Sequence, residues 1–194
     1  MFLNLIKVYK YWILYLYILI LDKILSKKKI KIILNNNFLE VKIIYYNLFN
    51  ILTILKYHSL TKFNTLLDIV VYNLFSKKYQ FIITYLLKSM RFNSRVNITT
   101  FLKDTTLPAS ITLIYPNAEW LEREVWDFFG INFLNNLDLR RLLNDYGFKG
   151  HPLLKNFPLV GYLEIIYSEK YYMLTYNKVE LTQEYKNFVS NNSW

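Results

Sequence analysis

The chain has 194 residues, a formal charge of +10 and no cysteine. Its length fits one modest domain with additional segments, because domains typically contain about 100–200 residues. The lack of cysteine excludes disulfides, a thiolate nucleophile and cysteine-ligated zinc or iron–sulfur sites. Because the chain has only two histidines, His58 and His151, a histidine-rich metal site is not expected either.

The composition points to coding bias rather than to a binding function. Lysine outnumbers arginine 19 to 5, and alanine occurs twice. This pattern is typical of an AT-rich genome, such as that of an organelle. Because AT-rich codons also raise the aromatic content, the value of 19% is weak evidence for a binding surface. The basic charge is concentrated in residues 1–31, which contain seven lysines and one aspartate. The rest of the chain is close to ordinary in charge.

The N-terminal segment, residues 1–29, contains an uninterrupted apolar run over 11–21. A helix of that length would span roughly 16 Å, about half of a hydrocarbon core, which argues against a transmembrane helix. No small-residue cleavage site follows, so a secretory signal peptide is not indicated. The pattern favours a helix buried against this domain or a neighbouring protein. A helix lying on a membrane surface stays an alternative.

Residues 30–102 predict a hairpin, a helix and then three strands. The hairpin is indicated by a β-rich run, three asparagines and an alternating run. The expected ranges are 30–34 and 38–44 for the hairpin, 47–57 for the helix, and 63–72, 79–87 and 95–102 for the later strands. With the N-terminal helix, the order helix, two strands, helix, three strands predicts a two-layer α+β domain with a mixed sheet. No glycine-rich turn joins a strand to a helix, which argues against a nucleotide site.

A third helix is predicted over 117–129. Asn117 is placed to cap its N-terminus, and Gly130 is placed for a left-handed residue at its C-terminus. Two faces are expected. The apolar face contains Ala118, Leu121, Val125 and Phe128, and the charged face contains Glu119, Glu122 and Arg123. A short helical turn is expected over 138–143.

The chain changes character in its C-terminal part. All eight glycines and prolines lie between Pro108 and Gly161. Regular structure cannot run through such spacing, yet the segment is too apolar for a flexible linker. We therefore predict three parts, namely an N-terminal helix of unassigned role over 1–29, an α+β domain over 30–130 and an extended docking segment over 131–194.

No self-contained active site is evident. Glu122 and Glu124 diverge by about 200° on a helix, which argues against a shared-proton carboxylate pair and favours structural ion pairs. Arg140 and Arg141 could bind phosphate or RNA, but ion pairs are the favoured interpretation. His151 could carry a proton, although a packed hydrogen-bonding role is favoured. A G-x-S-x-G nucleophile elbow is absent from the sequence.

Several motifs resemble a known family. They are Glu122-Arg-Glu-Val-Trp-Asp-Phe-Phe-Gly130, Asp138-Leu-Arg-Arg-Leu-Leu-Asn-Asp-Tyr-Gly-Phe-Lys-Gly-His-Pro152, Phe157-Pro-Leu-Val-Gly-Tyr162, Arg91-Phe-Asn-Ser-Arg95 and Asn117-Ala-Glu-Trp120. Together they resemble the 30-kilodalton subunit of respiratory NADH:ubiquinone oxidoreductase, complex I, over residues 30–194. The chain departs from that pattern at Asn136, Leu154 and Asn156, where charged residues are usual.

The resemblance implies a structural subunit without a cofactor in the quinone module of the hydrophilic arm. It implies docking to the 49-kilodalton subunit, with FMN and iron–sulfur clusters held by partner subunits, on the matrix side of the mitochondrial inner membrane. The complex passes electrons from NADH to ubiquinone and translocates protons. The residues expected to be critical for assembly are Glu122, Arg123, Glu124, Asp127, Arg140, Arg141, Asp145, Tyr146, Gly147, His151 and Pro152.

One alternative from another functional class stays open. A chain of charge +10 could be a basic RNA-binding protein of an organellar ribosome. The concentration of charge in residues 1–31 argues against it, as does the absence of a recognisable RNA-recognition motif.

Overall fold

The computed structural model describes residues 31–35, 38–74, 79–103, 106–183 and 185–186. The chain divides into two units, Met1–Leu154 and Lys155–Trp194, which are treated separately below. The helix expected within residues 1–29 lies outside the described residues.

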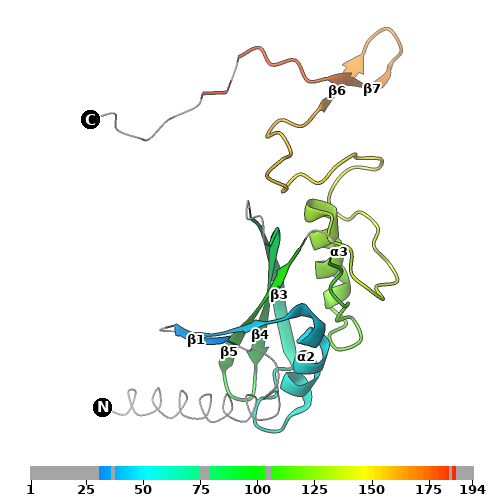
Figure 1. Cartoon of the computed structure of the whole chain (residues 1–194). Coiled ribbons are helices and arrows are strands. Elements are labelled where there is room, and N and C mark those ends of the chain that lie inside the picture. Colours follow the sequence, from blue (N-terminus) through cyan, green and yellow to red (C-terminus); the bar gives the residue numbers. More distant parts are fainter. Residues whose placement is uncertain (1–30, 36–37, 75–78, 104–105, 184, 187–194) are drawn as a thin grey trace, which may run out of the picture. The chain divides into compact units, whose positions relative to one another are not determined.

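The first unit is built on a five-stranded mixed sheet, which confirms the predicted α+β class. The strand order is β1 (Lys31–Asn35), β2 (Phe38–Ile43), β5 (Ser94–Leu102), β4 (Phe81–Ser89), β3 (Thr65–Asn73). The β2–β5 pairing is parallel and the other pairings are antiparallel (Figure 1). Each strand boundary lies within about two residues of its sequence prediction, because alternation of apolar and polar side chains is a strong strand signal.

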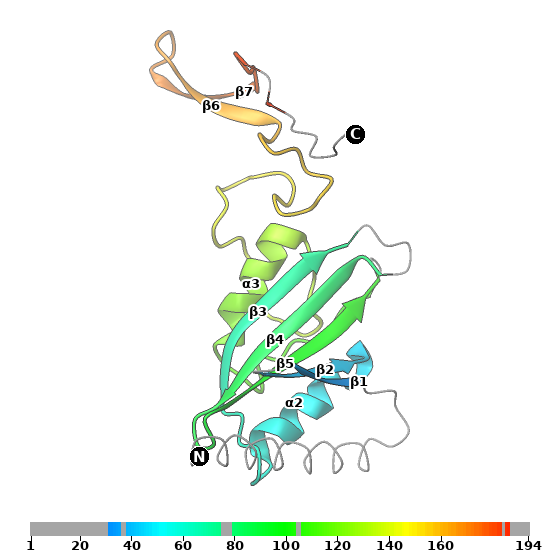
Figure 2. The ribbon, with the colours of Figure 1, turned by 90° about the vertical axis from the view of Figure 1, so that its left-hand side faces the viewer.

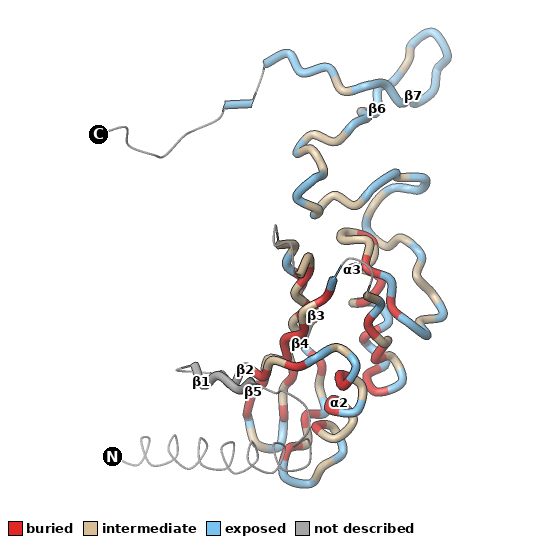
Figure 3. The backbone as a smooth tube through the Cα atoms, in the orientation of Figure 1, coloured by how far each residue is buried: buried red, intermediate tan, exposed pale blue. Residues whose placement is uncertain are grey.

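Helices cover one face of this sheet. A 3-10 turn, η1 (Tyr45–Asn47), leads into α2 (Leu48–Tyr57), and α3 (Ala118–Phe129) lies beside it on the same face (Figures 1 and 2). Alternate residues of β4, from Phe81 to Ser89, are buried against the helices. Figure 3 shows buried residues along the sheet strands and along α2 and α3. The core is therefore formed between the sheet and the helices.

The two ends of α3 differ in how well the sequence predicted them. Gly130 has a φ of 73° and its N–H donates to the Trp126 carbonyl at 2.8 Å, which confirms the left-handed C-terminal residue. The prediction that Asn117 caps the N-terminus is wrong. Asn117 has helical dihedral angles, and its amide donates to the Leu66 carbonyl of β3 at 2.8 Å. The side chain ties α3 to the sheet instead.

One further prediction in this region is wrong. Residues 138–143 form no helical turn, because the backbone N–H groups of Leu142 and Leu143 donate to a side chain of α3 described below. On the charged face of α3, Glu122 and Arg123 are buried. The sequence pattern did not show that an irregular segment covers this side of the helix.

The second unit contains a hairpin that was not predicted. Its strands, β6 (Leu163–Ser168) and β7 (Met173–Lys178), pair antiparallel in one continuous register. The glycines and prolines that argue against regular structure end at Gly161, so they do not interrupt these strands. Among the described residues of the whole chain, no helix is long and apolar enough to cross a membrane.

Candidate functional site

The C-terminal end of α3 is capped by a segment that leaves the helix and then returns to it. We call residues 138–151 the clasped loop. The last carbonyls of a helix lack partners within the helix. Here the Nδ1 atom of His151 lies 3.0 Å from the Asp127 carbonyl oxygen, and the N–H of Leu153 donates to the Phe128 carbonyl at 3.1 Å. The return of the chain therefore satisfies carbonyl groups that α3 leaves open.

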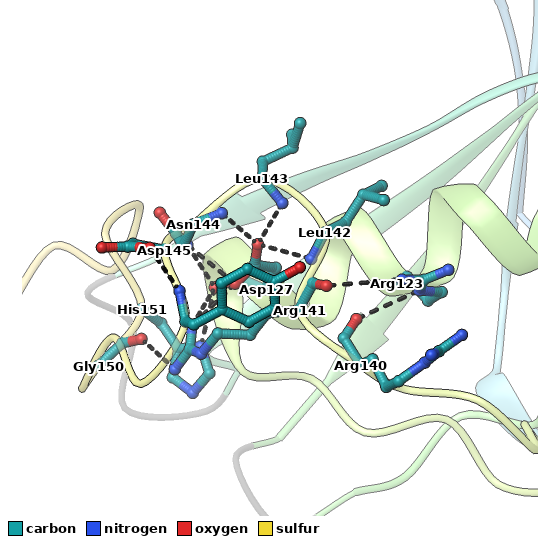
Figure 4. Close-up of polar contacts among 11 residues, drawn as sticks. Arg123, Asp127, Arg140, Arg141, Leu142, Leu143, Asn144, Asp145, Gly150 and His151 are labelled. Carbon is teal, nitrogen blue, oxygen red and sulfur yellow. Dashed lines mark hydrogen bonds and ion pairs between the residues drawn. The ribbon is translucent and has the colours of Figure 1, made fainter.

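The carboxylate of Asp127 holds the loop in place. It is fully buried and receives the N–H groups of Leu142, Leu143 and Asn144 at 3.2, 2.9 and 2.9 Å. The Asn144 amide donates at 2.9 Å, and Arg141 forms an ion pair at 2.7 Å. In Figure 4 these contacts converge on Asp127 from one side of α3. Five donors on one carboxylate fix the loop backbone to the helix.

These donors also set the ionisation of Asp127. Burial by itself would raise the pKa of this carboxyl group. The hydrogen bonds from Asn144, Leu143 and Arg141 outweigh that effect, and they hold the pKa of Asp127 well below its usual range. The group is therefore a carboxylate at neutral pH and acts as an acceptor, not as a proton donor.

Arg141 connects the two ends of the clasped loop. Its second guanidinium nitrogen, Nη2, donates to the Gly150 carbonyl at 2.9 Å. The guanidinium group also lies 5.4 Å from the ring of Trp126 and 5.5 Å from the ring of Phe148. Arginine suits this position, because its planar fork combines ion pairing, hydrogen bonding and aromatic stacking.

Arg123 supports the start of the loop. Its Nε donates to the Arg140 carbonyl at 3.2 Å, and its Nη2 lies 3.5 Å from the Arg141 carbonyl (Figure 4). The guanidinium group stacks 4.8 Å from the ring of Trp120. Arg123 therefore places a buried cation against backbone carbonyls of the loop.

Glu122 fixes two other loops to α3. Its carboxyl group is fully buried and accepts hydrogen bonds from the Ile111 N–H, the Ser110 hydroxyl and the Asn136 amide, each at 2.8 Å. Burial raises the pKa of Glu122, and these three donors only partly oppose that effect. The donors are neutral, so the predicted ion-pair role is wrong for this residue. At position 136, where the resemblance predicts a charged residue, the neutral amide of Asn136 binds Glu122.

The His151 ring packs closely against Gly130 at the C-terminal end of α3. A Cβ atom built on Gly130 would lie 2.7 Å from Cδ2 and 2.8 Å from Nε2 of the His151 ring. The ring also meets Trp126 edge-on at a centroid distance of 6.0 Å. This packing matches the interpretation that was favoured from the sequence.

The outer surface of this region is apolar and accessible. The side chains of Leu137, which precedes the clasped loop, and of Leu143 and Tyr146 within it are exposed, and Tyr146 is 99% exposed. Arg140 is exposed as well and forms a 2.7 Å ion pair with Asp138. The same stretch of chain thus has a fixed backbone and uncovered large side chains.

The structure sorts the candidate residues into three groups. Arg123 and Asp127 of α3 contact the clasped loop, and Arg141 and His151 of the loop contact Asp127. Glu122 contacts residues 110, 111 and 136. The others lie on the loop surface, beside it or elsewhere on the helix, namely Glu124, Arg140, Asp145, Tyr146, Gly147 and Pro152.

Sequence reasoning missed three polar contributors. They are Ser110, Asn136 and Asn144, which donate to the two buried carboxyl groups. Asn144 lies inside the recognised motif, which was a usable signal. Ser110 lies outside the recognised motifs, and neither it nor Asn136 had a signal that pointed to Glu122.

The region offers no metal-binding set. Among the residues that the structure describes, no group of three or more histidine, cysteine, aspartate or glutamate side chains could hold a metal ion. The sequence contributes no cysteine anywhere. The chain therefore lacks the thiolate ligands of an ordinary iron–sulfur cluster.

Comparison with known proteins connects this region to a respiratory family. The sequence profile described as "Respiratory-chain NADH dehydrogenase, 30 Kd subunit" matches residues 41–163. A Beta trigyna protein named NADH dehydrogenase [ubiquinone] iron-sulfur protein 3 is 44% identical over 147 residues, covering 76% of this chain and 77% of its own length. NADH-ubiquinone oxidoreductase subunit 9 of Reclinomonas americana is 43% identical over 148 residues, covering 76% and 72%.

Solved structures share the fold. The trypsin-resistant fragment of Nqo5 superposes with a TM-score of 0.52 at 23% identity, covering 64% of this chain and 98% of the fragment. A chain of the membrane-bound sulfane sulfur reductase, an archaeal respiratory membrane complex, gives a TM-score of 0.60 at 25% identity, covering 73% and 85%. The profile match and the two sequence relatives show that this chain belongs to the family of 30-kilodalton subunits of respiratory-chain NADH dehydrogenase, complex I.

Proposed function

We propose that this chain is a structural subunit, without a catalytic group or cofactor of its own, in the quinone module of mitochondrial complex I. It docks to the 49-kilodalton subunit on the matrix side of the inner membrane. Flavin and iron–sulfur clusters in partner subunits carry the electrons from NADH to ubiquinone, and the assembled complex couples this transfer to proton translocation. The chain contributes by holding its neighbours in a fixed geometry.

The observation that carries this proposal is the clasped loop. Its backbone is tied to α3 through Asp127, whereas the side chains of Leu143 and Tyr146, and of Leu137 beside the loop, are exposed. Ordering a flexible loop on binding costs free energy, and a loop that is already ordered avoids that cost. Large exposed side chains on a preorganised backbone are typical of the anchors that dominate protein interfaces.

The geometry supports a positioning role rather than a chemical one. Asp127 is a carboxylate with five donors around it, and Glu122 is enclosed by three donors. Neither group is accessible to a substrate, because both side chains are fully buried. A subunit that fixes its neighbours still affects rate, because small displacements of reacting groups slow a reaction strongly.

The contacts of the paired arginines weaken the RNA-binding alternative. Arg141 is engaged with Asp127 and Gly150, and Arg140 with Asp138. Each guanidinium group is thus already paired with a carboxylate. Salt-dependent nucleic-acid binding depends on cationic groups that are available to pair with phosphates.

The test replaces exposed side chains of this region in the full chain. Tyr146→Ala and Leu137→Ser should lower the amount of assembled complex I several-fold, because they remove anchors without disturbing the fold. Activity per assembled complex should stay unchanged. Tyr46→Ala, which alters an exposed tyrosine on η1, is the matched control. Normal assembly with a reduced rate per complex would contradict the proposal and would indicate a catalytic role.

A further inference from the structure

The described part of the C-terminal unit has no core of its own. In its described part, residues 155–183 and 185–186, no side chain is buried. An isolated two-stranded hairpin is at best marginally stable in water, and it usually needs a packing partner on one face. The β6–β7 hairpin therefore lacks the burial that would normally support it.

The two faces of this hairpin are chemically different. Side chains alternate between faces along each strand, and directly paired residues share a face. One face, which we call the apolar face, contains the pairs Ile165–Tyr176 and Tyr167–Leu174, and also Leu163 with its partner Lys178 at the open end of the hairpin. The opposite face is mainly polar and contains Glu164, Ile166, Ser168, Met173, Thr175 and Asn177. The five apolar side chains of the apolar face are exposed, and Lys178 at its edge is exposed as well.

The charge of the unit argues against a lipid surface as the occupant of this face. Residues 155–194 contain four lysines and four glutamates, so the unit has no basic excess. Hairpins and helices that bind anionic membranes usually surround their apolar face with lysine and arginine. A balanced set of charges around an apolar face is more typical of the rim of a protein interface.

The area of the face argues against a second copy of the same hairpin. Five half-exposed side chains, two of them aromatic, offer roughly 500 Å² for burial. A stable interface of ordinary size needs about 800 Å² from each partner. The face is thus too small to hold a dimer by itself, but it suits one of several contacts made by the same chain.

We propose that the apolar face of the β6–β7 hairpin docks onto an apolar surface of a neighbouring protein subunit of the complex. This inference rests on the proposed function, because it assumes that the chain is assembled with such neighbours. The hairpin makes a contact separate from that of the clasped loop. Two linked contacts raise the overall affinity, since the second one forms at a high effective concentration.

Adjacent isoleucines provide a matched test of this face. Ile165 belongs to the apolar face and is 51% exposed, whereas Ile166 belongs to the polar face and is 42% exposed. Ile165→Lys and Ile166→Lys make the same chemical change one residue apart. Each variant is introduced into the full chain, which is captured by a tag together with the other complex I subunits.

We expect Ile165→Lys to reduce the recovered subunits at least about tenfold, because it buries a charge in an apolar contact. Ile166→Lys should stay within about twofold of the unsubstituted chain. Leu174→Lys and Met173→Lys repeat the comparison on β7. Circular dichroism of each variant should match that of the unsubstituted chain, since every replaced side chain is exposed.

The possible outcomes separate this inference from the proposed function. Equal recovery with Ile165→Lys and Ile166→Lys, while the unsubstituted chain assembles, would overturn the docking face and leave the proposed function standing. Failure of the unsubstituted chain to recover complex I subunits would overturn both. If the unsubstituted chain binds phosphatidylcholine–phosphatidylserine vesicles and Ile165→Lys abolishes this binding, the partner of the apolar face is a lipid surface and the inference is overturned. If the unsubstituted chain forms a dimer and Ile165→Lys dissociates it, the partner is a second copy of the chain, which also overturns the inference.

Discussion

The clasped loop and the C-terminal unit are alike in composition but differ in how much the rest of the chain supports them. Both are rich in large apolar residues, and both lie in or beside the part of the chain that contains its glycines and prolines. The loop is ordered by α3, whose Asp127 accepts five hydrogen bonds from it. Residues 155–183 and 185–186 contain no buried side chain at all.

This difference distinguishes the two surfaces that we propose for docking. Where its own helix supplies acceptors, an irregular segment becomes a preformed surface. Where none of the described side chains is buried, a hairpin with one apolar face would gain stability from burial by another molecule. The first kind should be sensitive to substitutions inside the chain, and the second kind to substitutions on its exposed face.

The largest effect is expected from breaking the clasp itself. Asp127→Ala should lower the free energy of unfolding by about 3–5 kcal/mol, because it leaves Arg141 and three backbone N–H groups without their acceptor. Urea denaturation of the full chain measures this change, and limited proteolysis should show new cleavage within residues 138–151.

Asp138→Ala is the control for that prediction, because Asp138 forms an ion pair with the exposed Arg140. It should change stability and cleavage little. If the two aspartate variants behaved alike, the loop would not depend on the buried carboxylate, and the contrast with the C-terminal unit would lose its basis.

A smaller effect is expected from adding a side chain at Gly130, where His151 packs against the end of α3. Gly130→Ala should destabilise the chain by about 2–4 kcal/mol, because it combines a left-handed backbone with a contact on the His151 ring. Gly147 has the same φ of 73°, but no atom lies within 4 Å of the position that its Cβ would occupy, so Gly147→Ala should cost only about 1–2 kcal/mol. Thermal unfolding of the two variants isolates the His151 contact. Equal losses would mean that His151 is not packed there.

The smallest effect is expected from titrating the clasp. The pKa of Asp127 is depressed in the folded chain, so its stabilising contribution is present above the unfolded pKa and is lost as the pH falls. Between pH 5 and pH 3 the unsubstituted chain should lose about 1 kcal/mol more stability than Asp127→Asn. Glu122 has a raised pKa and acts in the opposite direction, but it contributes equally to both proteins.

Denaturation of the two proteins at each pH measures the difference. Asp138→Asn serves as the comparison variant, since it leaves the buried carboxylate in place. The hydrogen bond from Arg140 also lowers the pKa of Asp138, but solvent screens this exposed pair, so the variant should keep most of the pH dependence. Parallel pH profiles for the unsubstituted chain and Asp127→Asn would contradict the assignment of Asp127 as the titrating anchor.

Local patterns were enough to predict most of the regular structure. The five strands of the first unit and both described α-helices follow from alternation and helical spacing, and Gly130 marked the end of α3. The β6–β7 hairpin was not predicted, and the predictions that failed in the first unit concern contacts between separate segments. Asn117 binds Leu66 across 51 positions, so no local rule could have replaced its expected capping role. Residues 138–143 form no helical turn, because Asp127 accepts the N–H groups of Leu142 and Leu143.

The sequence by itself determined the α+β class, the family motifs and the lack of cysteine ligands, because these depend on residue type and on spacing along the chain. Only the tertiary structure decided which charged residues of α3 are buried, which donors enclose Asp127 and Glu122, and which side chains stay exposed. The physical reason is that burial and hydrogen bonding depend on two segments that folding brings together. The sequence of one segment does not show which other segment it will contact.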